Sequence, residues 1–121
     1  MKRKKDLISI LDLTKEEILD ILDVADYIKE RHLRGMAYQP LKSKTIGLLF
    51  QRHSTRTRVS FDAGAFQLGA KAIDLDIKDL QLSRGETIGD TARVLSRYLD
   101  AVVIRGGHKF LQNSPHIPRF P

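Results

Sequence analysis

The sequence predicts an α/β fold in which helices flank a parallel sheet. Two observations lead to this prediction. Segments with helical and strand character alternate as α-β-α-β-α-β with short connections, and the clearest strand candidate is a continuous apolar run. Such runs are typical of strands buried on both faces, and right-handed crossovers between them give a parallel sheet. A length of 121 residues fits one domain.

The first helix is predicted by its cap and its periodicity. Thr14 and Glu17 have the spacing of a capping box, and Gly35 follows a basic last turn near Arg31. Apolar residues recur at helical spacing and predict that one face is buried. These residues are Ile18, Leu22, Ala25 and Ile28.

The remaining elements alternate from residue 45 onward. We expect strands over 45–50, 72–75 and 101–104, the last one ending on Arg105. A second helix is predicted to start at Ser54 or Thr55 and to stop at Gly69. A third is predicted to be capped by Ser83 or Thr87 and to run to Tyr98. Three prolines crowd the end of residues 106–121, which we interpret as an irregular tail after an ordered domain over 1–105.

Residues 50–58 carry the strongest functional signal. Three hydroxyls and three guanidiniums lie within residues 52–58, where the first strand leads into the second helix. Free N–H groups and the positive dipole end make a helix N-terminus suited to an oxyanion. Ser54, Thr55 and Thr57 add hydroxyl donors, and Arg56 and Arg58 add forked donors. An ordinary N-cap with solvated arginines is the alternative, and the paired arginines favour the anion site.

The fold itself brings further residues to this site. Ligands of parallel α/β sheets bind beyond the carboxyl ends of the strands. Those ends lead here to residues 54–58, to the loop that holds Gln81, and to Arg105. We therefore expect these three groups to converge on one edge of the sheet.

Composition disfavours several other classes of protein. The net charge is +6, but the basic block of residues 2–5 has no interleaved aromatic residues, so it indicates a solvated tail and no nucleic-acid partner. There are no cysteines, and the four histidines lack ligand spacing, so the composition indicates no metal site. No segment is apolar enough to span a membrane, and a cytoplasmic location is expected.

The motifs together resemble the aspartate/ornithine carbamoyltransferases. The resemblance covers about residues 1–105 and is closest to the carbamoyl-phosphate-binding half of the ornithine enzymes, which are two-domain, doubly wound proteins. It rests on Ser54-Thr55-Arg56-Thr57-Arg58-Val59-Ser60-Phe61, Gln81-Leu82-Ser83-Arg84-Gly85-Glu86, Asp90-Thr91-Ala92-Arg93-Val94-Leu95-Ser96 and Ile104-Arg105.

This resemblance implies roles for individual residues. Ser54, Thr55, Arg56 and Thr57 would hold the phosphate of carbamoyl phosphate, and Arg105 with Thr57 would polarise its carbonyl. Gln81 would reach the phosphate of a neighbouring subunit in a homotrimer. Arg58 would add a further donor to this set or would instead brace the loop.

The implied activity is carbamoyl transfer to L-ornithine, which gives citrulline and phosphate for arginine biosynthesis. This chemistry implies that no metal and no organic cofactor is needed. Aspartate or putrescine is the alternative acceptor. The family's second, ornithine-binding half has no counterpart in this sequence, so we expect a truncated fragment. Such a fragment binds carbamoyl phosphate at most, or acts without catalysis by associating with full-length subunits.

Overall fold

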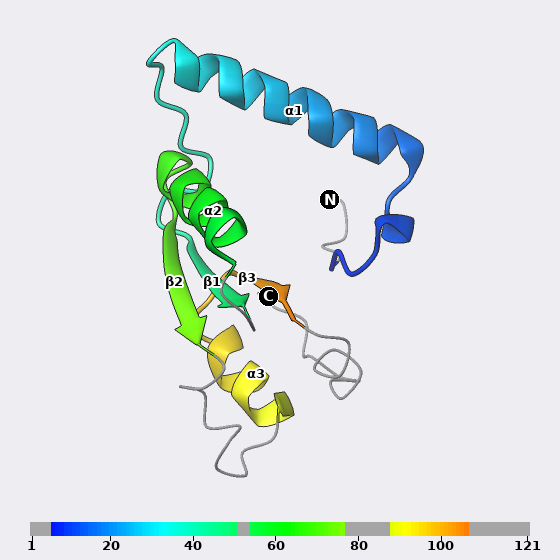
Figure 1. Cartoon of the computed structure of the whole chain (residues 1–121), viewed down its shortest axis with the longest axis vertical. Coiled ribbons are helices and arrows are strands. Elements are labelled where there is room, and N and C mark those ends of the chain that lie inside the picture. Colours follow the sequence, from blue (N-terminus) through cyan, green and yellow to red (C-terminus); the bar gives the residue numbers. More distant parts are fainter. Residues whose placement is uncertain (1–5, 51–53, 77–87, 107–121) are drawn as a thin grey trace. The chain divides into compact units, whose positions relative to one another are not determined.

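The computed structural model describes residues 6–50, 54–76 and 88–106 of the chain. The chain divides into two compact units, residues 1–38 and residues 39–121 (Figure 1). The described elements are η1 (Ile10–Asp12), α1 (Lys15–Leu33), β1 (Thr45–Phe50), α2 (Thr55–Gln67), β2 (Lys71–Asp76), α3 (Ile88–Ser96) and β3 (Ala101–Arg105).

The ends of α1 in the first unit follow from local sequence. The Thr14 hydroxyl accepts from the Glu17 N–H at 3.2 Å, and the Glu17 carboxylate accepts from the Thr14 N–H at 3.0 Å. The predicted capping box is therefore confirmed. The helix ends at Leu33, and Gly35 then takes a φ of 68°, which an L side chain adopts only with strain.

Two features of this unit differ from the prediction. The short helix η1 was not expected, although Ser9 and Asp12 repeat the capping-box spacing and form the box. The buried face predicted for α1 is wrong, because no residue of the helix is buried and Leu22 is 55% exposed. Apart from α1, the only other element in the described part of this unit is the three-residue η1. This short helix is too small to cover the row of apolar side chains along α1.

The second unit holds a parallel sheet with β1 at its centre. The strand order is β2-β1-β3, and both pairings are parallel, as the alternation of elements predicts. Phe50 is in register with Asp76 on one side and with Arg105 on the other. The carboxyl ends of all three strands are therefore level at one edge, and α2 packs against β1 and β2 (Figure 1).

Burial explains why β1 takes the central place. Its last four residues are buried, as expected for a strand covered on both faces. Gly47 leaves room for neighbours, because a Cβ there would lie 2.7 Å from Leu99 Cδ1. The buried apolar side chains among the described residues are Leu48, Leu49, Phe50, Ala65, Ala70, Ala92 and Leu99.

The amino ends of β1 and β3 are joined by Asp100. Its carboxylate accepts from the Thr45 N–H at 2.8 Å, and its own N–H donates to the Thr45 carbonyl at 2.8 Å. The Lys44 ammonium lies 3.8 Å from the same carboxylate. This connection aligns the two strands from the edge opposite to their carboxyl ends.

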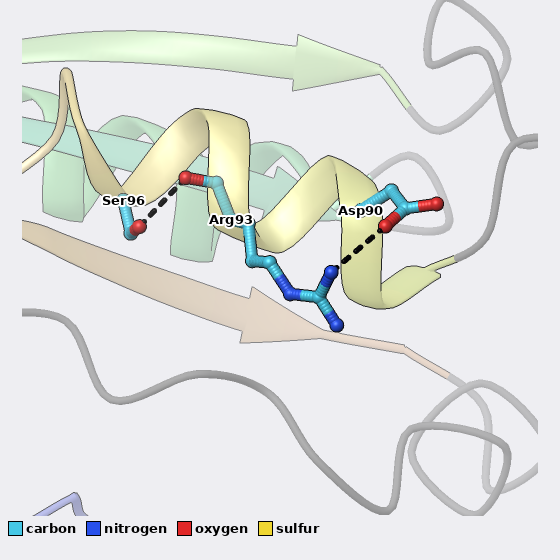
Figure 2. Close-up of polar contacts among 3 residues, drawn as sticks. All are labelled: Asp90, Arg93 and Ser96. Atoms are coloured by element: carbon cyan, nitrogen blue, oxygen red, sulfur yellow. Dashed lines mark hydrogen bonds and ion pairs between the residues drawn. The ribbon is translucent and has the colours of Figure 1, made fainter.

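Helix α3 is shorter than predicted. It stops at Ser96, and the next residues form a tighter turn in which the Tyr98 N–H bonds the Leu95 carbonyl at 3.0 Å. Arg93 donates to the Asp90 carboxylate at 3.1 Å across one turn, and the Ser96 hydroxyl donates to the Arg93 carbonyl at 2.8 Å. Figure 2 marks both bonds by dashed lines. Asp90, Arg93 and Ser96 of the sequence motif at residues 90–96 therefore have hydrogen-bond partners within the helix itself. The predicted caps, residues 83 and 87, lie outside the described residues.

Candidate oxyanion-binding site

The candidate site lies at the carboxyl edge of the sheet, beside the central strand. In the order β2-β1-β3 the chain passes from β1 to β2 on one side of it and then crosses back to β3 on the other side. The direction in which successive strands are added therefore reverses at β1. Ligands of open α/β sheets bind in the crevice at such a switch point. The first turn of α2 follows β1, and Arg105 ends β3, so both lie at this edge.

Ser54 occupies the N-cap position of α2 without acting as a cap. Its side chain makes no capping hydrogen bond, and its hydroxyl accepts instead from Arg105 Nη1 at 2.5 Å. The first N–H with a partner inside the helix is that of Arg58, which donates to the Ser54 carbonyl at 2.9 Å. The N–H groups of Thr55, Arg56 and Thr57 belong to the first turn, where an α-helix supplies no carbonyl partner.

One guanidinium nitrogen joins the two hydroxyls. Arg105 Nη1 also donates to the Thr57 hydroxyl at 2.5 Å. Because both hydroxyl oxygens act as acceptors here, the O–H bonds of Ser54 and Thr57 are left to donate to another group. Arg105 is exposed and retains further N–H donors, so the three side chains together form a cluster of hydrogen-bond donors.

The first turn of α2 carries an unfavourable positive charge. It contains no acidic residue, while Arg56 lies close to the positive end of the helix dipole. Thr55 and Arg56 are exposed, and among the described residues Arg56 forms no ion pair. A bound oxyanion would meet the free N–H groups and offset this charge.

Arg58 is directed toward the sheet. Its guanidinium lies 3.2 Å from the carboxylate of Asp74 on β2 and donates a hydrogen bond to it. The contact fits the bracing role named as the other possibility for Arg58. Asp74 was not among the residues singled out from the sequence. The signal was present, because Asp74 is an acid within the short apolar run 72–75.

The structure thus brings together Ser54, Thr57 and Arg105, whose convergence was expected. Thr55 and Arg56 share the first turn of α2 with Thr57. Gln81, the remaining candidate, lies outside the described residues. Within the described ranges, no group of three or more His, Asp or Glu could hold a metal ion. In the same part of the chain, every helix is too short or too polar to cross a membrane.

Comparison with known proteins gives a consistent result. The family described as "Aspartate/ornithine carbamoyltransferase, carbamoyl-P binding domain" matches residues 5–118, so the match continues past residue 105, where the motif resemblance ended. The ornithine carbamoyltransferase of Oceanobacillus iheyensis is 52% identical over 101 residues, which are 84% of this chain and 31% of that protein.

Two solved structures are similar over most of this chain. Ornithine carbamoyltransferase from Pyrococcus furiosus superimposes with a TM-score of 0.82 at 47% identity, covering 90% of this chain and 35% of that one. The anabolic ornithine carbamoyltransferase of Campylobacter jejuni gives a TM-score of 0.83 at 36% identity, covering 98% and 38%. The chain therefore spans about a third of the length of the relatives it matches.

Fold and site define a parallel α/β protein with a cluster of oxyanion donors at its topological switch point. The family match and the sequence identities of about 50% identify the protein more specifically than its fold and site do. The chain belongs to the aspartate/ornithine carbamoyltransferase family and corresponds to its carbamoyl-phosphate-binding domain.

Proposed function

We propose that this chain binds carbamoyl phosphate at the carboxyl edge of its sheet. The observation that carries the proposal is the Arg105 guanidinium, which bonds the Ser54 and Thr57 hydroxyls instead of leaving Ser54 to cap α2. A Ser that served only helix stability would bond the N–H groups of its own helix. The phosphate dianion would be held by the first-turn N–H groups, by Ser54 and Thr55, and by Arg56.

The same arrangement suits the chemistry of carbamoyl transfer. An amine attacks the carbonyl carbon, the bond from that carbon to the phosphate oxygen breaks, and a proton of the amine ends on the released phosphate. Negative charge grows on the carbonyl oxygen and on the leaving group. Donors already in position stabilise both charges at little reorganisation cost. Arg105 and Thr57 are proposed to polarise the carbonyl, as the resemblance implies.

We infer that L-ornithine is the acceptor in the whole protein and that citrulline is the product. The support is that the three relatives described above are all named ornithine carbamoyltransferase, and that the one from Campylobacter jejuni is called anabolic. An anabolic role fits arginine biosynthesis. Assembly into homotrimers, with Gln81 reaching a neighbour's phosphate, is part of the same proposal and rests on the family resemblance.

Calorimetric titration of the 121-residue chain with carbamoyl phosphate tests the binding proposal. We expect saturable binding that inorganic phosphate displaces. The double variant Ser54→Ala/Arg105→Ala should lose it, whereas Ser96→Ala/Arg97→Ala should keep it, because this control makes the same side-chain changes away from the edge. Absence of binding to a folded wild-type chain, or equal binding by both double variants, contradicts the proposal.

A further inference from the structure

We propose that Asp74 is a positioning residue that holds the Arg58 guanidinium out of the anion site. The inference rests on the proposed function and concerns the number of guanidiniums that face the phosphate. Among the described residues, three arginines lie at or near this edge, and their contacts differ. Arg105 bonds hydroxyls, Arg56 has no ion-pair partner among the described residues, and Arg58 is paired with Asp74.

Helix geometry shows why Arg58 needs a restraint. Arg58 follows Ser54 by four residues, so both lie on the same side of α2, one turn apart. Long helical side chains lean toward the helix N-terminus, which is here the end that carries the anion donors. Without a partner, the guanidinium of Arg58 would be drawn toward an anion held at that end.

The position of Asp74 in the sheet sets where Arg58 goes instead. Asp74 pairs in register with Leu48, two residues before the level at which Phe50 and Asp76 end their strands. Two residues of a strand span about 7 Å, so the carboxylate lies well back from the edge. The contact between Arg58 Nη1 and Asp74 Oδ2 at 3.2 Å therefore draws the guanidinium away from the edge and along the sheet.

The ion pair is suited to a restraint of moderate strength. The side chains of Arg58 and Asp74 are 40% and 55% exposed, and pairs of this kind contribute little to stability. Removing the Asp74 charge therefore leaves the fold intact and releases Arg58. A released Arg58 adds a further guanidinium to the site, so the site binds phosphate more tightly. The physiological consequence is that Asp74 keeps the phosphate product from being retained.

Affinity for inorganic phosphate, measured by calorimetry on the 121-residue chain, tests this role through a double-mutant cycle. Asp74→Asn should tighten phosphate binding about threefold to tenfold, since a charge-assisted bond is gained when the pair is broken. Arg58→Gln should change the affinity by less than about twofold, because in the wild type Arg58 does not face the anion. Asp74→Asn in the Arg58→Gln background should then have no further effect.

The cycle separates this role from the two simpler ones. If Asp74 only braced α2, Asp74→Asn would weaken phosphate binding. If Asp74 acted only by its charge, Asp74→Asn would tighten phosphate binding by the same factor in the wild-type and in the Arg58→Gln background. Either result, or an unchanged affinity, overturns the inference while the binding proposal stands. A wild-type chain that binds no phosphate overturns both. Asp74→Ser is the second variant if Asp74→Asn lacks the circular dichroism spectrum of the folded chain.

Discussion

Arg105 donates a hydrogen bond to the hydroxyl of Thr57, although the two residues are 48 positions apart in the sequence. Their meeting depends on the register of the sheet, which places Arg105 level with Phe50, the last residue of β1. The start of α2 follows that strand directly in the chain. The candidate site is therefore a product of the pairing between β1 and β3.

Replacing Arg105 by alanine should weaken carbamoyl-phosphate binding. The lost charge-assisted hydrogen bonds are worth about 1.5–3 kcal/mol, roughly a tenfold to hundredfold loss of affinity. Calorimetry measures the change, with Arg97→Ala as the control, because it removes the same charge from an exposed arginine away from the edge. Unchanged affinity in the Arg105 variant would remove this residue from the site.

Arg56→Lys separates a forked contact from a simple positive charge. Lysine keeps the charge and loses the planar fork that grips a phosphate through two bonds. We expect at least a tenfold loss of carbamoyl-phosphate affinity, which corresponds to about 1.4 kcal/mol. Circular dichroism must first show that the variant keeps its helices. Equal affinity in a folded variant would mean that Arg56 acts as a point charge.

Asp100→Ala should destabilise the sheet from the edge opposite to the site. The variant removes the carboxylate that accepts from the Thr45 N–H at 2.8 Å. We expect the free energy of unfolding in urea to fall by about 0.5–1.5 kcal/mol. Asp62→Ala is the control, because Asp62 is exposed on α2 and its replacement should not lower stability. Equal losses in both variants would refute a specific role for Asp100.

Two glycine variants, one inside α2 and one just after its end, should change stability in opposite directions. Gly69 has a φ of 90°, and a Cβ there would lie 2.9 Å from the Gln39 Cβ, so Gly69→Ala should cost about 1–2 kcal/mol. Gly64 lies inside the helix with nothing within 4 Å of a Cβ, so Gly64→Ala should add about 0.5–1 kcal/mol. Urea unfolding compares the two, and a destabilising Gly64→Ala would contradict the open surface at that position.

Local sequence was sufficient for most element boundaries. Thr14 and Glu17 cap α1 through contacts within four residues of chain, and Gly35 and Gly69 mark helix ends by a backbone conformation suited to glycine. The apolar run 45–50 also predicted the central strand, because a strand that is buried on both faces has apolar residues at successive positions. The donor types at residues 54–58 are equally a property of the sequence.

Partners across the sheet required the tertiary structure. Whether Ser54 caps its helix or bonds Arg105 depends on the distance between α2 and β3, which no local pattern contains. The pairing of Arg58 with Asp74 depends in the same way on the register of β2. The sequence alone was thus enough to predict which groups could hold an oxyanion, and to place residues 54–58 at the start of α2 and Arg105 at the end of β3. Only the folded chain decides which partner each guanidinium bonds, because side chains distant in sequence compete for partners whose separation is set by strand pairing.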